Sequence, residues 1–581
     1  MCTTIIVGKR ASKTGRVIVG HNEDAGGRSL HQQFFCPGGK HAPGEVVSGE
    51  PGMAKVPQVP ETLDVYWSNM LAPAPGSSFD QGFANEAGLV ICSNAGGSAF
   101  DAESTDLTDG GVAFLLRRLM AERAKTAREA VEVARELLER YGYAGEARNY
   151  TVADRDEAWV INAVRGRRFV AKRVPDDCVM LISNALAIRT VDRSDTANVV
   201  ASADLVEYAV AQGRYTPAHP SSFDDFDFAR AYQSDDNRRN PEKSIRLREG
   251  WLAITGKYFE DELHYPEAMP PKAPMAVEDV IAILRTTAPE TYRTRGDGRA
   301  DAFHVNAIDI SRSHTRESWV MALGERPLFN TLWRVSSYPD TGVYVPWFVL
   351  AKGDAANPIP EGYAWTTLEE AHKVQFAMKP EYLDFDYARH YYLNAVLGEL
   401  VNFNRGLMAG VWSSREALES RFRIEVEAAL ENLTRSAMSD ADCRTALANF
   451  TREAQRRADQ RTAELLALLD TLDVRASRTE VPLCDTGEIE LSITAEAGFD
   501  ALAVDPETLL WSFGFTTAKA SVNEPAKPVA VRIQDERTLV AAFRTSDLAR
   551  FAPAGVLCDT YVRGFCAGRR FVGMVPIRFT A

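Results

Sequence analysis

The spacing of hydrophobic and polar positions changes twice along the chain. Up to about residue 348, short apolar and β-branched runs dominate, and such runs predict strands. The clearest runs are Thr3–Val7, Val17–Gly20, Glu157–Val164 and Phe169–Val174. One strongly helical region interrupts them, so this part of the chain is predicted to mix α and β structure.

The helical region begins at a capping signal and ends at a glycine. Thr126 and Glu129 have the spacing of a capping box, and Gly142 follows the last apolar position, Tyr141. Between them, apolar residues recur on one face of a helix. The pattern predicts a packed amphipathic helix.

The second half of the chain divides into a helical part and a β part. From about residue 385 to 472 the spacing is helical almost throughout, which predicts a bundle or a long hairpin. After the polar stretch Arg475–Glu480, short alternating runs predict a β-sandwich of about 100 residues. These runs are Glu488–Ile493, Val529–Ile533, Leu539–Phe543 and Phe571–Val575.

Composition narrows the class of partner. The 581 residues carry a formal net charge of −14, which argues against a general nucleic-acid partner. The basic pieces KSIRLR (243–248) and RGRR (165–168) are short and isolated, so we expect them to be solvated faces. The sequence has neither a signal-peptide pattern nor an apolar run of about 18 residues, so a soluble cytoplasmic protein without membrane contact is expected.

The eight cysteines include no C-x-x-C pair, and no disulfide framework, structural metal site or cofactor motif is predicted. One of them, Cys2, directly follows the initiator methionine at the head of a predicted strand. If Met1 is removed, Cys2 carries a thiol and a free α-amine on the same residue. An α-amine titrates near 7.7–8.0 and can act as the base for its own thiol.

Two further stretches carry polar groups suited to such a nucleophile. Asn22, Glu23 and Asp24 end an apolar run at a glycine-rich turn, where a carboxylate can hold or orient the amine; simple turn chemistry is the alternative. Asn94 follows a predicted strand, Leu89–Ser93, in a glycine-rich exit and is suited to an oxyanion hole.

Several motifs together resemble a known family. They are MCTT at the start, NED at 22–24, NEAGL at 85–89, the strand pair YTVADRDEAWVINAVRGRRFVAKRVPDD, and SRSHTRESWV with PDTGVYVPWF. Their order over roughly residues 1–470 resembles the dipeptidase A and secernin family of cysteine N-terminal nucleophile (Ntn) hydrolases, peptidase family C69. The resemblance implies an α+β fold, a four-layer αββα sandwich. We expect this core over residues 1–383, a helical extension over 384–474 and a C-terminal β-sandwich domain over 481–581.

The resemblance also implies roles for single residues. Cys2 is the expected nucleophile and base, Asp24 the partner of its amino group, and Asn94 the oxyanion donor. Asn184 in LISNAL looks like a second polar group near the nucleophile, with a capped strand end as the alternative. His21 stands where relatives usually carry arginine, which puts stabilisation of the thiolate by a permanent cation in question.

The function expected from the resemblance is hydrolysis of a dipeptide or another small amide, without metal or cofactor. An N-acyl amide hydrolase on the same fold and a non-catalytic, secernin-like interaction protein are the two alternatives. Arg312 and His314 in SRSHTRES are candidates either for binding a substrate carboxylate or for a structural role. Oligomeric state is not predicted.

Overall fold

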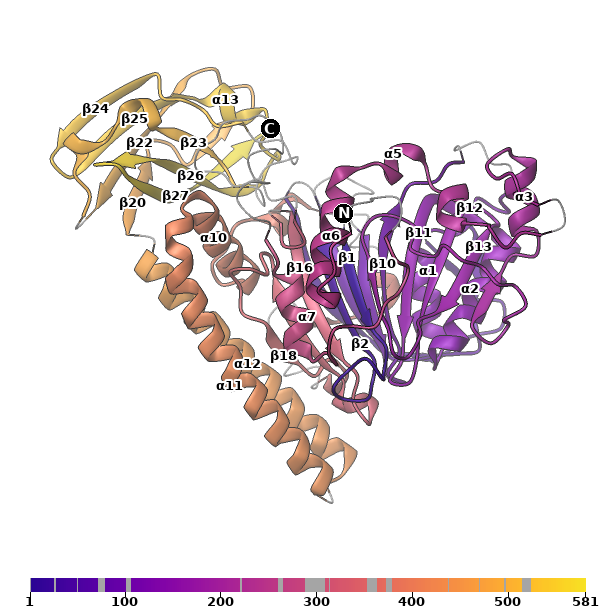
Figure 1. Ribbon diagram of the computed structural model, residues 1–581. Coiled ribbons are helices and arrows are strands. Elements are labelled where there is room, and N and C mark those ends of the chain that lie inside the picture. The colour runs from indigo at the N-terminus through magenta and orange to yellow at the C-terminus, as the bar shows by residue number, and fades with distance from the viewer. Residues whose placement is uncertain are drawn as a thin grey trace.

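The computed structural model describes residues 2–25, 28–49, 51–71, 79–100, 106–219, 222–259, 265–287, 309–312, 314–352, 363–371, 379–436, 438–469, 471–495, 498–514 and 524–581. Two large sheets form the centre of the N-terminal part (Figure 1). The first has six described strands in the order β14 (Val179–Ile182), β1 (Thr3–Val7), β2 (Ile18–Asp24), β16 (Thr315–Ala322), β17 (Thr331–Ser336) and β18 (Val345–Trp347). Its ladders are antiparallel.

The second sheet has nine described strands. Their order is β15 (Val199–Ala201), β13 (Phe169–Arg173), β12 (Ala158–Gly166), β11 (Tyr143–Ala153), β10 (Val90–Gly96), β9 (Phe79–Asn85), β8 (Val65–Leu71), β3 (Leu30–Cys36) and β19 (Tyr363–Trp365). Two short ribbons lie in the connection between β3 and β8. They pair β4 (Gly39–Lys40) with β7 (Glu61–Thr62), and β5 (Val46–Ser48) with β6 (Lys55–Pro57).

The two sheets pack face to face and helices cover both outer faces. Trp319 of β16 lies against Gly82 of β9, and the apolar residues of both inner faces form one buried cluster. Helices α1 (Leu115–Arg123) and α2 (Ala127–Tyr141) cover the nine-stranded sheet, whereas α6 (Pro241–Thr255) and α7 (Val277–Leu284) cover the six-stranded sheet. The expected four-layer αββα sandwich is thereby confirmed.

Local signals account for the predicted helix. The Thr126 side chain accepts a hydrogen bond from the backbone N–H of Glu129, and Gly142 ends α2 with φ at +77°. A side chain at this φ would be strained, which explains the glycine. Shorter helices lie in the segment of the chain between β15 and α6: α3 (Leu205–Ala211), α4 (Phe228–Tyr232) and α5 (Asp235–Arg238).

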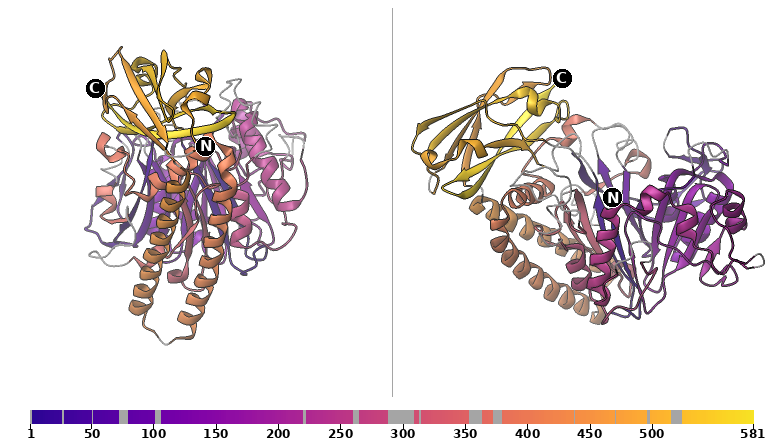
Figure 2. Two further views of the ribbon diagram at one scale, coloured as in Figure 1. Left: turned by 90° about the vertical axis from the view of Figure 1, so that its left-hand side faces the viewer. Right: turned by 45° about the horizontal axis from the view of Figure 1, so that its top comes forward.

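The predicted helical part consists of α10 (His390–Phe403), α11 (Met408–Arg435) and α12 (Asp440–Leu469). Helices α11 and α12 run side by side as a long hairpin (Figure 2). The hairpin packs on β18, and Phe422 and Leu447 belong to the same buried cluster as the sheets. It is therefore an extension of the core rather than a separate bundle.

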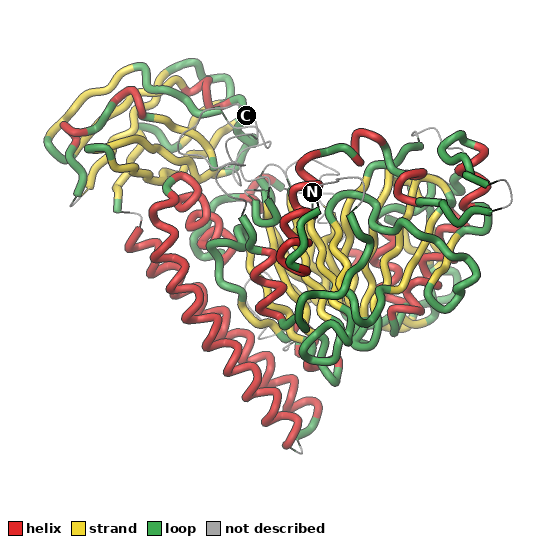
Figure 3. Tube along the Cα trace, viewed as in Figure 1, coloured by secondary structure: helices red, strands yellow, loops and turns green. Residues whose placement is uncertain are grey.

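The C-terminal part is the predicted β-sandwich (Figure 3). One sheet contains β20 (Leu472–Ala476), β22 (Glu488–Ala495), β25 (Thr538–Arg544) and β24 (Ala530–Asp535). The other contains β21 (Glu480–Pro482), β27 (Arg569–Thr580), β26 (Leu557–Cys566) and β23 (Leu510–Phe513), and α13 (Thr545–Ala549) follows β25. Because β20 pairs with β22, the sandwich already begins at Leu472, within the stretch assigned from the sequence to the helical extension.

Two local predictions were wrong. Asn22, Glu23 and Asp24 lie inside β2 rather than in a turn, because β1 pairs with one edge of that strand and β16 with the other. Asn94 lies inside β10, paired with Asn149 of β11, rather than in a glycine-rich exit. Within the described residues, no helix is both long and apolar enough to cross a membrane.

Candidate active site

The pairing of β1 with β2 gathers four polar side chains between the two sheets. Thr4 lies opposite His21 in the ladder, and side chains two positions apart point to the same face of a strand. Cys2, which directly precedes β1, and Thr4 therefore share a face, and His21 and Glu23 share it on β2. All four residues are buried.

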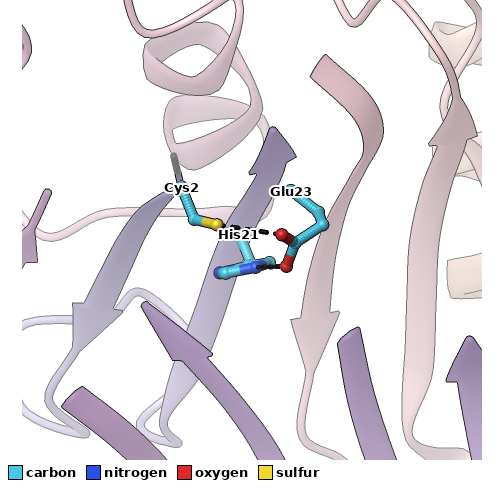
Figure 4. Close-up of side chains that lie close together, drawn as sticks. All are labelled: Cys2, His21 and Glu23. Atoms are coloured by element: carbon cyan, nitrogen blue, oxygen red, sulfur yellow. Dashed lines mark hydrogen bonds and ion pairs between the residues drawn. The ribbon is translucent and has the colours of Figure 1, made fainter. Parts of the chain in front are cut away.

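The Cys2 thiol lies beside the carboxylate of Glu23 and the imidazole of His21 (Figure 4). Its Sγ donates a hydrogen bond to Oε1 of Glu23 at 2.9 Å, and the other carboxylate oxygen lies 3.1 Å from Nε2 of His21. Glu23 thus bridges the thiol and the imidazole. Sequence reasoning assigned Glu23 no role of its own, because nothing in the pattern distinguished it from Asp24.

Electrostatics favour a charged His21–Glu23 pair. Burial by itself lowers the pKa of His21, but the interaction with Cys92 and hydrogen bonds with Cys2, Cys92 and Glu23 outweigh it and raise that pKa well above 6.5. Burial raises the pKa of Glu23, but the hydrogen bond and charge of His21 hold it below 4.5. The raised pKa of His21 and the lowered pKa of Glu23 therefore both favour a cation beside the thiol.

The backbone of Cys2 is held from the other side. Its nitrogen, which becomes the free α-amine once Met1 is removed, donates to Oδ1 of Asn184 at 2.5 Å. Asn184 follows β14, the neighbour of β1, and its amide nitrogen donates to the carbonyl oxygen of Ala95. The structure therefore brings Asn184 to the amine rather than to the thiol.

Sequence reasoning missed Arg246, which the structure places at the same point. Its guanidinium, on α6, donates to the carbonyl oxygen of Cys2 at 2.6 Å and to Oδ1 of Asn184 at 3.0 Å. The KSIRLR stretch was expected to be a solvated face, and this was wrong for Arg246, which is fully buried. A buried arginine needs acceptors, and only the fold brings Cys2 and Asn184 to it.

Asp24 follows Glu23 as the last residue of β2, opposite Thr315 of β16. Its Oδ1 accepts a hydrogen bond from Oγ1 of Thr315 at 2.7 Å, and Oδ2 lies 3.9 Å from Nε of Arg312. Burial raises the pKa of Asp24 although Arg312 lowers it. Arg312 thus contacts Asp24, while burial and the charge of Arg312 hold the pKa of His314 well below its usual value.

Asn94 reaches the cluster through Thr4. Its Oδ1 accepts a hydrogen bond from Oγ1 of Thr4 at 2.6 Å, and the same hydroxyl lies 2.7 Å from Nδ1 of His21. The buried Nδ2 of Asn94 has no hydrogen-bond partner among the described residues. A buried amide without an acceptor is costly unless a ligand supplies one, so this group is suited to binding an oxyanion.

Comparisons with known proteins extend these observations. A probable dipeptidase from Salmonella dublin is 27% identical over 388 residues, covering 64% of this chain and 87% of that protein. Dipeptidase A from Lactobacillus helveticus is 27% identical over 215 residues, covering 35% of this chain and 44% of that protein. Penicillin V acylase from Agrobacterium tumefaciens matches with a TM-score of 0.28 and 13% identity, over 58% of this chain and 83% of that one.

At this TM-score the acylase likeness adds nothing to the layer arrangement, which is established by the strand pairing and helix contacts of this chain. The family model for peptidase family C69 matches residues 81–338, which include Asn94, Asn184 and Arg246 but begin after Cys2, His21 and Asp24. Over this part the chain is similar to peptidase family C69, and together with the dipeptidase relatives this similarity indicates a peptidase.

Proposed function

We propose that this peptidase is a dipeptidase whose nucleophile is the thiol of Cys2, with the α-amine of the same residue as base. The observation that carries the proposal is the set of partners around Cys2. Glu23 accepts from its thiol, Asn184 accepts from its nitrogen, and Arg246 holds its carbonyl oxygen. Buried polar groups thus fix Cys2 at three separate atoms, and a nucleophile has to be held in place in this way to react efficiently.

The proposed reaction has two halves. The thiolate attacks the substrate carbonyl, and the oxyanion accepts a hydrogen bond from Nδ2 of Asn94. The α-ammonium, which holds the former thiol proton, passes it to the leaving amine, and a thioester with Cys2 remains. The amine then takes a proton from water, whose oxygen attacks the thioester and releases the acyl part as a carboxylic acid, and Cys2 regains its proton.

The names of the relatives, probable dipeptidase and dipeptidase A, support a dipeptide as the substrate of this protein. Dipeptides should be cleaved faster than N-acyl amino acids in steady-state assays with matched side chains. A preference for N-acyl amides would keep the mechanism and change the substrate class. Turnover of neither substrate by protein shown to lack Met1 would favour the non-catalytic alternative.

The mechanism is tested by intact-mass measurement after mixing with a slow ester substrate. We expect an acyl adduct on the peptide that carries Cys2, no adduct with Cys2→Ala, and active protein that lacks Met1. Cys2→Ala should retain the melting temperature of the wild type within a few degrees. Fully active protein that still carries Met1 would exclude the amine as base.

The chemistry also separates this enzyme from metal-dependent dipeptidases. Activity should survive exhaustive treatment with EDTA and stop on stoichiometric alkylation by iodoacetamide, with substrate protecting Cys2. Loss of activity in the chelator that zinc or manganese restores would refute the thiol mechanism.

A further inference from the structure

Cys2, His21 and Glu23 bring together one thiol, one imidazole and one carboxylate. One candidate ligand atom from each residue lies within 4.8 Å of the other two, and all three residues are buried. Sulfur, imidazole nitrogen and carboxylate oxygen are the ligand types that zinc takes, at about 2.0–2.3 Å from the ion. Ligand atoms around a tetrahedral zinc lie about 3.5 Å apart, so small side-chain rotations suffice to enclose an ion.

The surroundings of His21 orient its ring as in metal sites. Oγ1 of Thr4 donates its proton to Oδ1 of Asn94, so in the neutral imidazole Nδ1 carries the hydrogen that Thr4 accepts. The lone pair is then on Nε2, the nitrogen on the side of Glu23. Metal-binding histidines are held in one tautomer by such a hydrogen bond from the other ring nitrogen. An arginine at position 21 would supply a cation but no ligand atom.

We propose that this site binds one Zn²⁺ through Sγ of Cys2, Nε2 of His21 and a carboxylate oxygen of Glu23. Binding releases the thiol proton and any proton on Nε2 to solvent, and bonds form from the ion to sulfur, nitrogen and oxygen. The thiolate and carboxylate neutralise the dication inside the protein. The fourth position is left to water or to the freed α-amine.

The consequence for activity rests on the proposed function. A thiolate bound to zinc donates electron density to the ion and is a much weaker nucleophile towards a carbonyl, so we expect zinc to inhibit this enzyme and EDTA to activate partly loaded enzyme. Binding itself needs no catalytic role of Cys2. The two proposals can therefore fail separately.

Cobalt(II) is the probe for binding, because a thiolate bound to it gives a near-ultraviolet charge-transfer band that requires no turnover. Titration of the Met1-free protein should reach one cobalt per chain with this band, and zinc should displace it. Cys2→Ala and His21→Arg should abolish the band, with circular dichroism and melting temperature confirming that each variant folds. Thr4→Val removes the partner of Nδ1 and should weaken binding about 10–100-fold.

Cys484→Ser, at an exposed cysteine, is the matched control and should leave the titration unchanged. A band that persists in His21→Arg, or no band in the wild type, would overturn the site. If cobalt or zinc binds but raises turnover of dipeptides, the inhibitory role is wrong and so is the metal-independent mechanism. If metal binds and no acyl adduct forms on Cys2 of the metal-free enzyme, only the proposed function fails.

Discussion

His21 and Glu23 form a buried pair whose charges support each other. The pKa of His21 is raised from 6.5, so its contribution to stability is complete below pH 6.5 and is lost as the pH rises through the raised value. The pKa of Glu23 is lowered from 4.5, so its contribution is complete above pH 4.5 and is lost as the pH falls. The pair therefore stabilises the fold most between these two values.

His21→Gln should reduce the free energy of unfolding by about 3 kcal/mol between pH 5 and 6, because it leaves the Glu23 carboxylate without its cation. The difference from the wild type should shrink as the pH rises through the raised pKa of His21. Urea unfolding of both proteins across this range measures it. A difference that is constant with pH would show that His21 is neutral in the folded protein.

Asp24 is expected to orient the amine of Cys2 through its charge. Asp24→Asn should lower kcat/KM by about 10²-fold or more. The amide can still accept the hydrogen bond from Thr315, so the fold should be unchanged. Thr315→Val is the matched control for loss of that hydrogen bond alone and should cost less activity. Unchanged rates in Asp24→Asn would move the role to Glu23.

At the scale of elements, β2 carries the site on one face and packs against α7 with the other. Asn22, on that other face, donates hydrogen bonds to the carbonyl oxygens of Leu284 and Ile310. Gly20 shares the face and allows α7 to approach closely. A Cβ there would lie 2.4 Å from Cγ1 of Val280 and 3.2 Å from Cδ1 of Leu284.

Gly20→Ala should therefore lower the free energy of unfolding by about 1–3 kcal/mol through overpacking. Val280→Ala in the same protein should recover part of this loss, since it removes the nearest methyl group. Denaturant unfolding of the two single variants and the double variant measures the coupling. Gly39→Ala, where an added Cβ meets nothing within 4 Å, is the control; additive effects of Gly20→Ala and Val280→Ala would contradict the packing argument.

At the scale of the whole molecule, the C-terminal sandwich is joined to the segment that follows β2. Arg28 is fully buried and donates to Oδ1 of Asp559 at 3.1 Å, to the carbonyl oxygen of Leu383 and to the hydroxyl of Tyr392. Asp559 lies on β26 of the sandwich and also accepts from the hydroxyl of Tyr561. Apolar residues of α10 and of the sandwich complete a shared core.

Asp559→Ala should cost about 3–5 kcal/mol of stability, because it leaves the Arg28 guanidinium buried without its carboxylate. The exposed pair of Arg532 and Glu490 in the same sandwich supplies the control, and Glu490→Ala should cost at most about 1 kcal/mol. Thermal unfolding of both variants tests the difference. Equal effects would show that the sandwich is not held through Arg28.

The sequence by itself determined many of the local elements. Alternating apolar runs, the Thr126 cap and Gly142 are signals between near neighbours, and they were sufficient for strands such as β1, β12 and β13, for α2 and for the main strands of the sandwich. The layer order came from the resemblance, because strand order depends on pairing between distant segments. The sequence also led to the hypothesis that Cys2 carries both a thiol and a free α-amine once Met1 is removed.

Only the tertiary structure decided which groups surround Cys2. Asn22, Glu23 and Asp24 look like a turn in the sequence, since nothing local shows that β1 and β16 pair with both edges of their strand. Alternation along that strand then sends both His21 and Glu23 to the side of the thiol. Arg246 comes from a stretch that looks solvated, and it is buried because its acceptors, the Cys2 carbonyl and Asn184, lie 244 and 62 positions away in the chain.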